Sequence, residues 1–203
     1  MDDTNQSSST PVLLLHHASA IRADPELAQT ITTLVNEGYR NLPPDTALRW
    51  DRSAIEDRLS TPTAIHDTIG PEGMFAVAYD ARDQTTPLAC GAARRWKHDL
   101  EGFSAAGEAG WEIITVTTRL GWTRRGLAGQ CIDALVENLV GQAHKDGSDQ
   151  ALKIWVQAVE CLNGAFWKNK GWTEVRSYEK PVGHWGSKLG YSLLVLLKNI
   201  EVE

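Results

Sequence analysis

The chain has 203 residues, of which 42% are apolar and 23% are charged, and it carries a formal net charge of −6. This length and composition are typical of one compact globular domain. The acidic balance argues against nucleic acid as the main partner, because binding to a phosphate backbone requires a basic surface. We therefore expect a protein that binds neutral or cationic partners.

No membrane partner is expected, because no run of residues approaches the roughly 18 apolar positions that a membrane-spanning helix needs. Residues 1–10 are polar and low in complexity and lack the parts of a signal peptide, so we expect a disordered leader. Cys90, Cys131 and Cys161 have no metal-binding spacing. Neither disulfides nor a metal site are therefore predicted, and a cytoplasmic location fits. Residues 11–203 are expected to form a single domain.

The hydrophobic patterns predict both strands and helices. In chain order they predict a strand at 12–18, helices at 25–40, 52–60 and 63–69, strands at 73–80, 86–97 and 111–119, a helix at 126–145, a strand at 151–159, a helix at 163–170, and strands at 172–180 and 190–199. Because strands and helices are mixed along the chain, we expect a mixed sheet covered by helices on its faces, in the α/β (α+β) class.

The predicted strand at 111–119 is rich in β-branched residues, which suit a pleated surface. Simple alternation places successive side chains on opposite faces of the strand. It assigns Glu112, Ile114, Val116 and Thr118 to one face, and Trp111, Ile113, Thr115 and Thr117 to the other.

The chain between this strand and the next helix has the composition of an anion site. Gly126 has no Cβ to block a close approach, and the first amides of the following helix have no partner within the helix. Together with the side chains of Arg124 and Arg125 they favour a bound pyrophosphate. The nucleotide-hydrolase P-loop and the GxGxxG pattern are both absent. The alternative is an ordinary strand-to-helix turn with two solvated arginines.

The turn resembles the [Q/R]-x-x-G-x-[G/A] motif of the GCN5-related N-acetyltransferase (GNAT) superfamily. The six matching positions are Thr123, Arg124, Arg125, Gly126, Leu127 and Ala128, with Thr123 in place of the usual Gln or Arg. Residues 163–172 resemble the family region N-x-A-x-x-F-Y-x-x-x-G-F, with irregular spacing at its start. The resemblance covers roughly residues 11–200. It implies a mostly antiparallel sheet of about six to seven strands, and a turn that binds the pyrophosphate of acetyl-CoA through backbone amides.

The resemblance also implies roles for individual residues. Glu112, 14 positions before Gly126, stands where the histone-acetylating branch of the family has its general base. A backbone amide near Val116 would stabilise the oxyanion, and Val116, Thr118, Asn163 and Trp167 are expected to contact the cofactor. Trp167 occupies the position where many members have a Tyr as general acid, and an indole cannot supply that proton. The alternative for Glu112 is a solvated charge at a strand end.

Four residues are expected to bind the acceptor. His184 and Trp185 lie in the glycine-rich segment 181–190, a region that often lines the acceptor site in the family. Tyr39 and Trp50, close to the first two predicted helices, are further candidates. The alternative for 181–190 is an ordinary hairpin loop.

Together these features indicate an acetyl-CoA-dependent N-acetyltransferase in which an amine, in a small molecule or a peptide, attacks directly in a ternary complex. The alternative is a GNAT-fold protein that binds acyl-CoA or another ligand without transferring an acetyl group. A monomer or a homodimer is expected.

Overall fold

The computed structural model of the protein describes residues 10–41, 46, 48–147 and 150–202, so residues 1–9 of the predicted leader lie outside the described part. Seven strands form one sheet in the order β1-β2-β3-β4-β5-β7-β6. Neighbouring strands are antiparallel except for β4 and β5, which are parallel. The expected mostly antiparallel sheet is confirmed. The strands are β1 (Val12–His17), β2 (Met74–Tyr79), β3 (Pro87–Arg95), β4 (Trp111–Thr118), β5 (Leu152–Val159), β6 (Thr173–Lys180) and β7 (Tyr191–Ile200).

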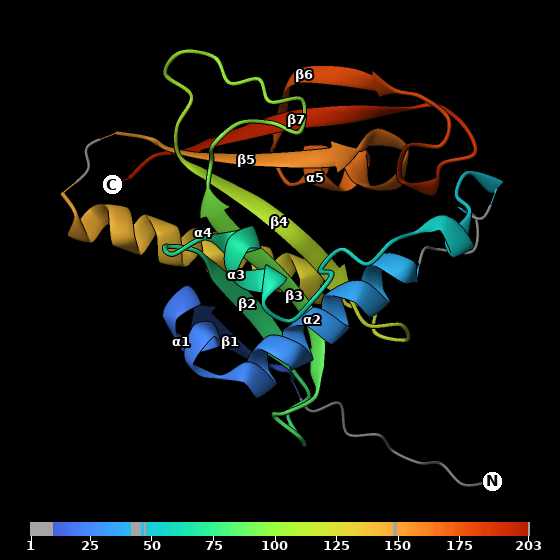
Figure 1. The fold of residues 1–203 in the computed structure, drawn as a ribbon. Coiled ribbons are helices and arrows are strands. Elements are labelled where there is room, and N and C mark those ends of the chain that lie inside the picture. The colour runs from blue at the N-terminus through green and yellow to red at the C-terminus, as the bar shows by residue number, and fades with distance from the viewer. Residues whose placement is uncertain (1–9, 42–45, 47, 148–149, 203) are drawn as a thin grey trace, which may run out of the picture.

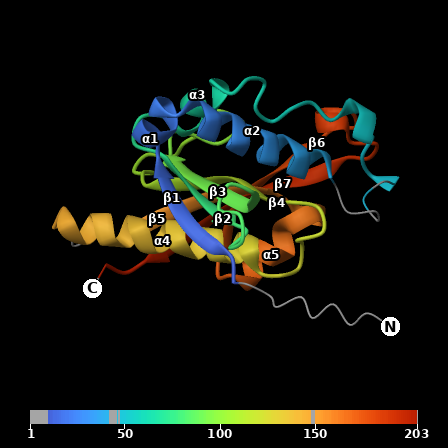
Figure 2. The same cartoon turned by 90° about the horizontal axis from the view of Figure 1, so that it is seen from below.

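Helices cover both faces of the sheet, as Figures 1 and 2 show. The helices are α1 (Ala18–Ala23), α2 (Pro25–Arg40), α3 (Ala64–Ile69), α4 (Leu127–Lys145) and α5 (Ala165–Asn169). Helices α1, α2 and α3 pack against Phe75 and Val77 of β2. Helix α4 packs on the other face against Met74 and Ala76, because successive side chains of a strand alternate. None of the helices among the described residues is both long enough and apolar enough to cross a membrane.

The predicted helix at 52–60 is wrong. The structure has only a short 3-10 turn, η2 (Arg52–Ala54), followed by an irregular segment. The carboxylate of Asp51 accepts hydrogen bonds from the amide and hydroxyl of Ser53, and the Asp51 amide donates to the Gly186 carbonyl at 2.8 Å. The loop 181–190, which is distant in sequence, therefore holds this segment. Such a contact cannot be predicted from the local spacing of apolar residues. Helix α1 was not predicted, because six residues are too few to show a helical period.

Strand β4 contains a β-bulge at which its register with β3 shifts. Thr115 has φ +49°, in the left-handed region that a β-branched residue rarely adopts. Before the bulge Ile114 faces the α2 side, whereas afterwards Val116 packs on the α4 side and Thr117 lies against Gly38 of α2. The prediction that Ile114 and Val116 share one face is therefore wrong, because one inserted residue reverses the alternation.

Strands β4 and β5 separate soon after they pair. Only Trp111–Ile113 of β4 pair with β5, where they lie opposite Ile154–Val156. Strand β5 continues alongside β7 as far as Val159. Figure 1 shows the two strands diverging toward the end of β4 that leads to α4. The backbone of β4 after Ile113 consequently has a strand neighbour only on its β3 side. This opening in the sheet positions the site.

Candidate functional site

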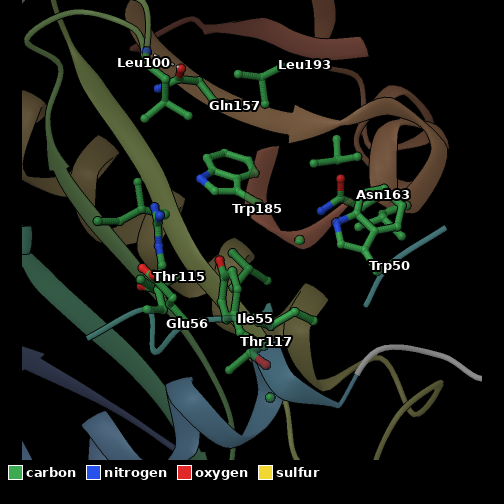
Figure 3. Close-up of a pocket in the computed structure, with 18 of the residues that line it drawn as sticks. Trp50, Ile55, Glu56, Leu100, Thr115, Thr117, Gln157, Asn163, Trp185 and Leu193 are labelled. Atoms are coloured by element: carbon green, nitrogen blue, oxygen red, sulfur yellow. Dashed lines mark hydrogen bonds between the residues drawn. The ribbon is translucent and has the colours of Figure 1, made fainter. Parts of the chain in front are cut away.

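A cavity of about 610 Å³ lies at the opening between β4 and β5. Figure 3 shows part of its lining, which comes from α2, the segment 50–58, β3, Leu100 of the loop 96–110, β4, β5, the segment 162–163, the loop 181–190 and β7. The volume falls within the range of small-molecule sites. Predicted site residues in its wall are Tyr39, Trp50, Glu112, Val116, Asn163 and Trp185.

Glu112 is a buried member of the cavity wall, only 2% exposed. Its Oε2 accepts from Arg94 Nε at 2.7 Å, and its Oε1 accepts from Gln157 Nε2 at 2.7 Å. Arg94 also donates to the Thr68 carbonyl, and Gln157 Oε1 accepts from the Leu100 amide at 2.7 Å. The alternative of a solvated strand-end charge is therefore wrong for Glu112.

This arrangement fixes the Glu112 carboxylate and leaves some of its hydrogen-bond acceptor positions unused. Each oxygen accepts one hydrogen bond from a side chain, whereas a carboxylate offers about four acceptor positions in all. Arg94 compensates the buried charge, without which burial of a carboxylate would be very costly. The unused acceptor positions are available to a water molecule or an ammonium group in the cavity.

The bulge lies in the cavity wall, on the same strand as this carboxylate. Thr115, Val116 and Thr117 line the cavity, at a point where β5 no longer pairs with β4. Amides that point toward β5 here have no partner strand, which is the property expected of donors to a developing negative charge. Thr118, half-buried, is absent from the cavity wall and lies one residue before the connection to α4.

The predicted anion site forms the N-terminus of the 19-residue helix α4. Gly126 is the residue before the helix and has φ +79°, and the space beside it where a Cβ would lie is open. The side chain of Arg125 folds back on the turn, donating to the Gly121 carbonyl at 3.3 Å and lying 4.5 Å from the centre of the Trp122 ring. Arg124 is exposed and also left-handed, with φ +61°. The two arginines are therefore not equivalent.

The other predicted turn residues divide by burial. Thr123 is exposed, Ala128 is half-buried, and the side chain of Leu127 is only 3% exposed in the core beneath α4. Leu127 can therefore contact a ligand only through its backbone amide. The first backbone hydrogen bond of α4 runs from the Gln130 amide to the Gly126 carbonyl, at 3.0 Å. The amides before Gln130 therefore have no acceptor within the helix.

Trp167 and Asn163, both predicted cofactor contacts, lie in different surroundings. Trp167 is 3% exposed and packs edge-on against Trp172, with ring centres 5.0 Å apart, in the core on the α4 side. It is not part of the cavity wall. Asn163 lies in a short π-helical turn, η3 (Glu160–Gly164), and lines the cavity. The predicted helix at 163–170 accordingly begins later, at Ala165.

Three of the four predicted acceptor residues, Tyr39, Trp50 and Trp185, lie in the cavity wall, and His184 does not. Trp185 is 43% exposed and lines the cavity, whereas the adjoining His184 turns its Nδ1 to the Tyr191 hydroxyl, 2.5 Å away. Burial, with Lys180 nearby, lowers the pKa of His184, and burial raises the pKa of Tyr191. The Arg58 guanidinium lies 5.8 Å from the centre of the Tyr39 ring. Burial also raises the pKa of Tyr39.

Sequence reasoning missed Arg94 and Gln157, which hold Glu112 from the neighbouring strands β3 and β5. Arg94 and Gln157 lie within predicted strands and belong to no motif that the sequence shows. The available signal was the pairing of strands, since Arg94 stands directly opposite Glu112 in the β3–β4 register.

The sequence itself matches no family model and no curated protein sequence. The fold, however, matches many solved structures. Escherichia coli ElaA aligns with a TM-score of 0.57 at 12% identity, over 93% of this chain and 99% of that chain. Arabidopsis thaliana NAA60 in complex with a bisubstrate analogue aligns with a TM-score of 0.56 at 10% identity, over 94% and 100% of the two chains. A GNAT-family protein from Desulfovibrio desulfuricans aligns with a TM-score of 0.54 at 10% identity, over 95% and 100%.

The chain has the GNAT fold. The predicted fold is thereby confirmed over nearly the whole chain, although identities of 10–12% establish the architecture alone. Within this GNAT fold, the bulge and the divergence of β4 and β5 lie at the cavity that contains Glu112, and the turn before α4 follows β4 in the chain.

Proposed function

We propose that the chain transfers an acetyl group from acetyl-CoA to the nitrogen of an amine acceptor. The observation that carries this proposal is the opening between β4 and β5, which has the buried Glu112 near its closed end and the unpaired bulge at Thr115 in its wall. The turn with open space beside Gly126 lies beyond the wide end, after β4. One strand thus connects a fixed carboxylate, a stretch of backbone without a neighbour on its β5 side, and the turn that would bind an anion.

Two features of the described residues fit acetyl-CoA. The amides at the start of α4 and the exposed Arg124 would hold its pyrophosphate, since negative charge is stabilised at a helix N-terminus. Val116 on β4 and Asn163 after β5 would flank the arm that leads to the thioester. When bound, acetyl-CoA supplies the activated acetyl group. A NatC complex with Gag peptide and CoA, which aligns with a TM-score of 0.56 at 12% identity, supports this choice of cofactor.

The residues around the cavity suit direct attack. The acceptor nitrogen attacks the thioester carbonyl carbon, so that a C–N bond forms, the C–S bond breaks and the sulfur leaves as a thiolate. Glu112 takes the proton from the nitrogen through a water molecule that occupies its free acceptor positions. Amides of the bulge near Val116 stabilise the negative charge on the carbonyl oxygen. A thiolate with a pKa of roughly 8.5 is a tolerable leaving group without a dedicated acid.

A second candidate function is the binding of acyl-CoA without transfer. The position of Trp167 favours it, because the side chain at the predicted general-acid position is packed in the core and does not reach the cavity. Both functions require the turn before α4, and only the first requires the cavity to hold an amine.

The experiment that separates the two functions combines binding with chemistry. The protein is titrated with CoA by calorimetry, and separately incubated with acetyl-CoA and a panel of primary amines whose products are weighed by mass spectrometry. We expect CoA binding and an acetylated amine. Binding without any product would support the second candidate, and the absence of CoA binding would contradict both.

A further inference from the structure

One end of the cavity has a continuous apolar wall. Trp50, Tyr191 and Leu193 form a buried cluster against which Val159 and Leu162 pack. The ring of Trp185 stacks on Tyr191, with centres 6.2 Å apart and planes inclined by 26°. The members of this apolar wall that face the cavity are Trp50, Val159, Leu162, Trp185 and Leu193. None of them carries a charge or a hydrogen-bonding group other than an indole N–H.

The apolar wall is held in place by backbone pairing between two distant segments. Trp50 and Ser187 form an isolated antiparallel bridge, and the Asp51 amide donates to the Gly186 carbonyl at 2.8 Å. A Cβ on Gly186 would lie 3.2 Å from the Asp51 carbonyl oxygen, so the two segments are in close contact. These backbone contacts therefore hold the segments that carry Trp50 and Trp185 against each other.

Trp185 has a conformation that suggests a role in binding. Its φ of +52° is left-handed, which is unusual for a bulky residue and costs of order 1 kcal/mol or more. Although strained, the indole does not reach the core: 43% of the residue is exposed, and it lines the cavity, as Figure 3 shows. Nearly half of a large aromatic surface thus remains to be covered by a ligand.

The charged part of the cavity wall lies apart from the apolar wall in the fold. It comes from the segment 56–58, β3 and β4, and its charged members are Glu56, Asp57, Arg58, Arg94 and Glu112. Asp57 is paired with Arg40 and Glu112 with Arg94, so these charges are balanced, and Glu112 is the carboxylate on β4 toward which an ammonium group would point. A primary amine arrives at neutral pH as an ammonium ion and must lose its proton before it attacks.

We propose that the acceptor is a primary amine attached to an aromatic or branched apolar group. The apolar group lies against Trp50 and Trp185, and the amine points toward Glu112. This inference rests on the proposed acetyl transfer and names its acceptor. A polyamine or an amino sugar fits poorly, because its polar groups would be desolvated against a wall that offers almost no hydrogen-bond partners. A small amine and the first residue of a peptide share the required chemistry.

Acceptor preference tests the proposal directly. The kcat/KM is measured with 2-phenylethylamine, ethylamine and 1,4-diaminobutane, and with two short peptides that begin with Phe or with Gly. We expect kcat/KM for 2-phenylethylamine to exceed the values for ethylamine and 1,4-diaminobutane by roughly tenfold or more, because its ring is buried against the apolar wall. If kcat/KM for the peptide that begins with Phe exceeds the values for the Gly peptide and for the small amines, the acceptor is the first residue of a peptide. Equal or higher values for ethylamine or 1,4-diaminobutane overturn the proposal.

Substitution of Trp185 tests the wall itself. In Trp185→Ala we expect kcat/KM for 2-phenylethylamine to fall by roughly tenfold, mainly through KM, with little change for ethylamine. Trp185→Phe should retain most of the preference. Phe103→Ala is the matched control, since Phe103 is 50% exposed and outside the cavity wall. An equal loss for every acceptor in Trp185→Ala contradicts a role in recognising the apolar group.

Binding without acetyl-CoA separates this inference from the proposed function. The interaction of 2-phenylethylamine with the protein is followed by ligand-observed NMR, for the wild type and Trp185→Ala. Binding that depends on Trp185, with no acetylation of any amine, supports the apolar acceptor site and contradicts acetyl transfer. Transfer to other amines, with no binding of 2-phenylethylamine, supports acetyl transfer and contradicts the apolar acceptor site.

Discussion

Arg94 and Glu112 stand directly opposite each other in the register of β3 and β4, and Arg94 Nε donates to Glu112 Oε2 at 2.7 Å. The ion pair therefore follows from strand pairing, because facing residues of an antiparallel pair project to the same side. It holds the buried Glu112 carboxylate in the cavity wall in one position.

We predict that Glu112→Gln keeps its affinity for CoA and lowers turnover on an amine by roughly 10² or more. The loss should shrink at high pH, where a larger fraction of the amine is already deprotonated. Turnover is measured between neutral and alkaline pH, and CoA affinity by calorimetry. Glu72→Gln is the matched control, because Glu72 also pairs with an arginine, Arg95, but is 57% exposed. Normal turnover of Glu112→Gln at neutral pH would show that Glu112 is not the base.

The two arginines of the turn should contribute unequally to CoA binding. Arg124→Ala should weaken CoA binding by on the order of 1 to 2 kcal/mol, as expected for a charge-assisted contact to phosphate. Arg125→Ala should cost less, because Arg125 is already engaged with the Gly121 carbonyl and the Trp122 ring. Calorimetry with CoA measures both variants. A larger loss for Arg125→Ala would mean that its side chain leaves the turn when CoA binds.

Gly126→Val should weaken CoA binding severely. A valine at φ +79° is strained, and its side chain would fill the open space beside the amides of α4. Thermal unfolding is recorded in parallel, so that a folding defect is not mistaken for a binding defect. Unchanged CoA affinity in a folded Gly126→Val protein would exclude this turn as the phosphate site.

Gly38 permits the close approach of α2 to the second half of β4. A Cβ on Gly38 would overlap the Thr117 side chain, so Gly38→Ala should lower the free energy of unfolding by about 1–3 kcal/mol. The double variant with Thr117→Ala should recover much of the loss. Gly141→Ala in α4 is the control: it has no atom in the way and should stabilise the protein by about 0.5–1 kcal/mol. Chemical denaturation measures all three, and equal effects of the two Gly→Ala changes would contradict a tight contact at Gly38.

The stability that depends on Asp99 should be lost in acid. Burial alone would raise the pKa of Asp99, but hydrogen bonds from Arg176 and Tyr178, both 2.8 Å from its Oδ2, outweigh burial and hold the pKa below its usual range. A carboxyl whose pKa is depressed by folding stabilises the protein above the unfolded value of 3.8, and this contribution disappears as the pH falls through the folded pKa. Asp99→Asn should therefore be less stable than wild type at neutral pH.

The difference in unfolding free energy between wild type and Asp99→Asn should narrow below about pH 4. Denaturation series at several pH values measure it. Asp133→Asn is the control, because Asp133 is 59% exposed in its pair with Lys170 and should change stability by less than about 1 kcal/mol at any pH. A difference for Asp99→Asn that is independent of pH would mean that the lost contact is not ionic.

Local sequence signals predicted the parts of the site that lie within one stretch of chain. The strand, the turn at Gly126 and the helix α4 follow from β-branched residues, a glycine and helical spacing. The partners of Glu112 come from β3 and β5, so they depend on the register between strands, which no local pattern contains. The missing helix at 52–60 has the same cause, since contacts with the loop 181–190 override the local preference.

The bulge at Thr115 has a consequence for how β4 can vary. One inserted residue decides which side of the sheet every later side chain of β4 faces. Loss of one residue here would turn Val116 toward α2 and Thr117 toward the core beneath α4. We therefore expect this strand to tolerate the insertion or deletion of two residues better than that of one.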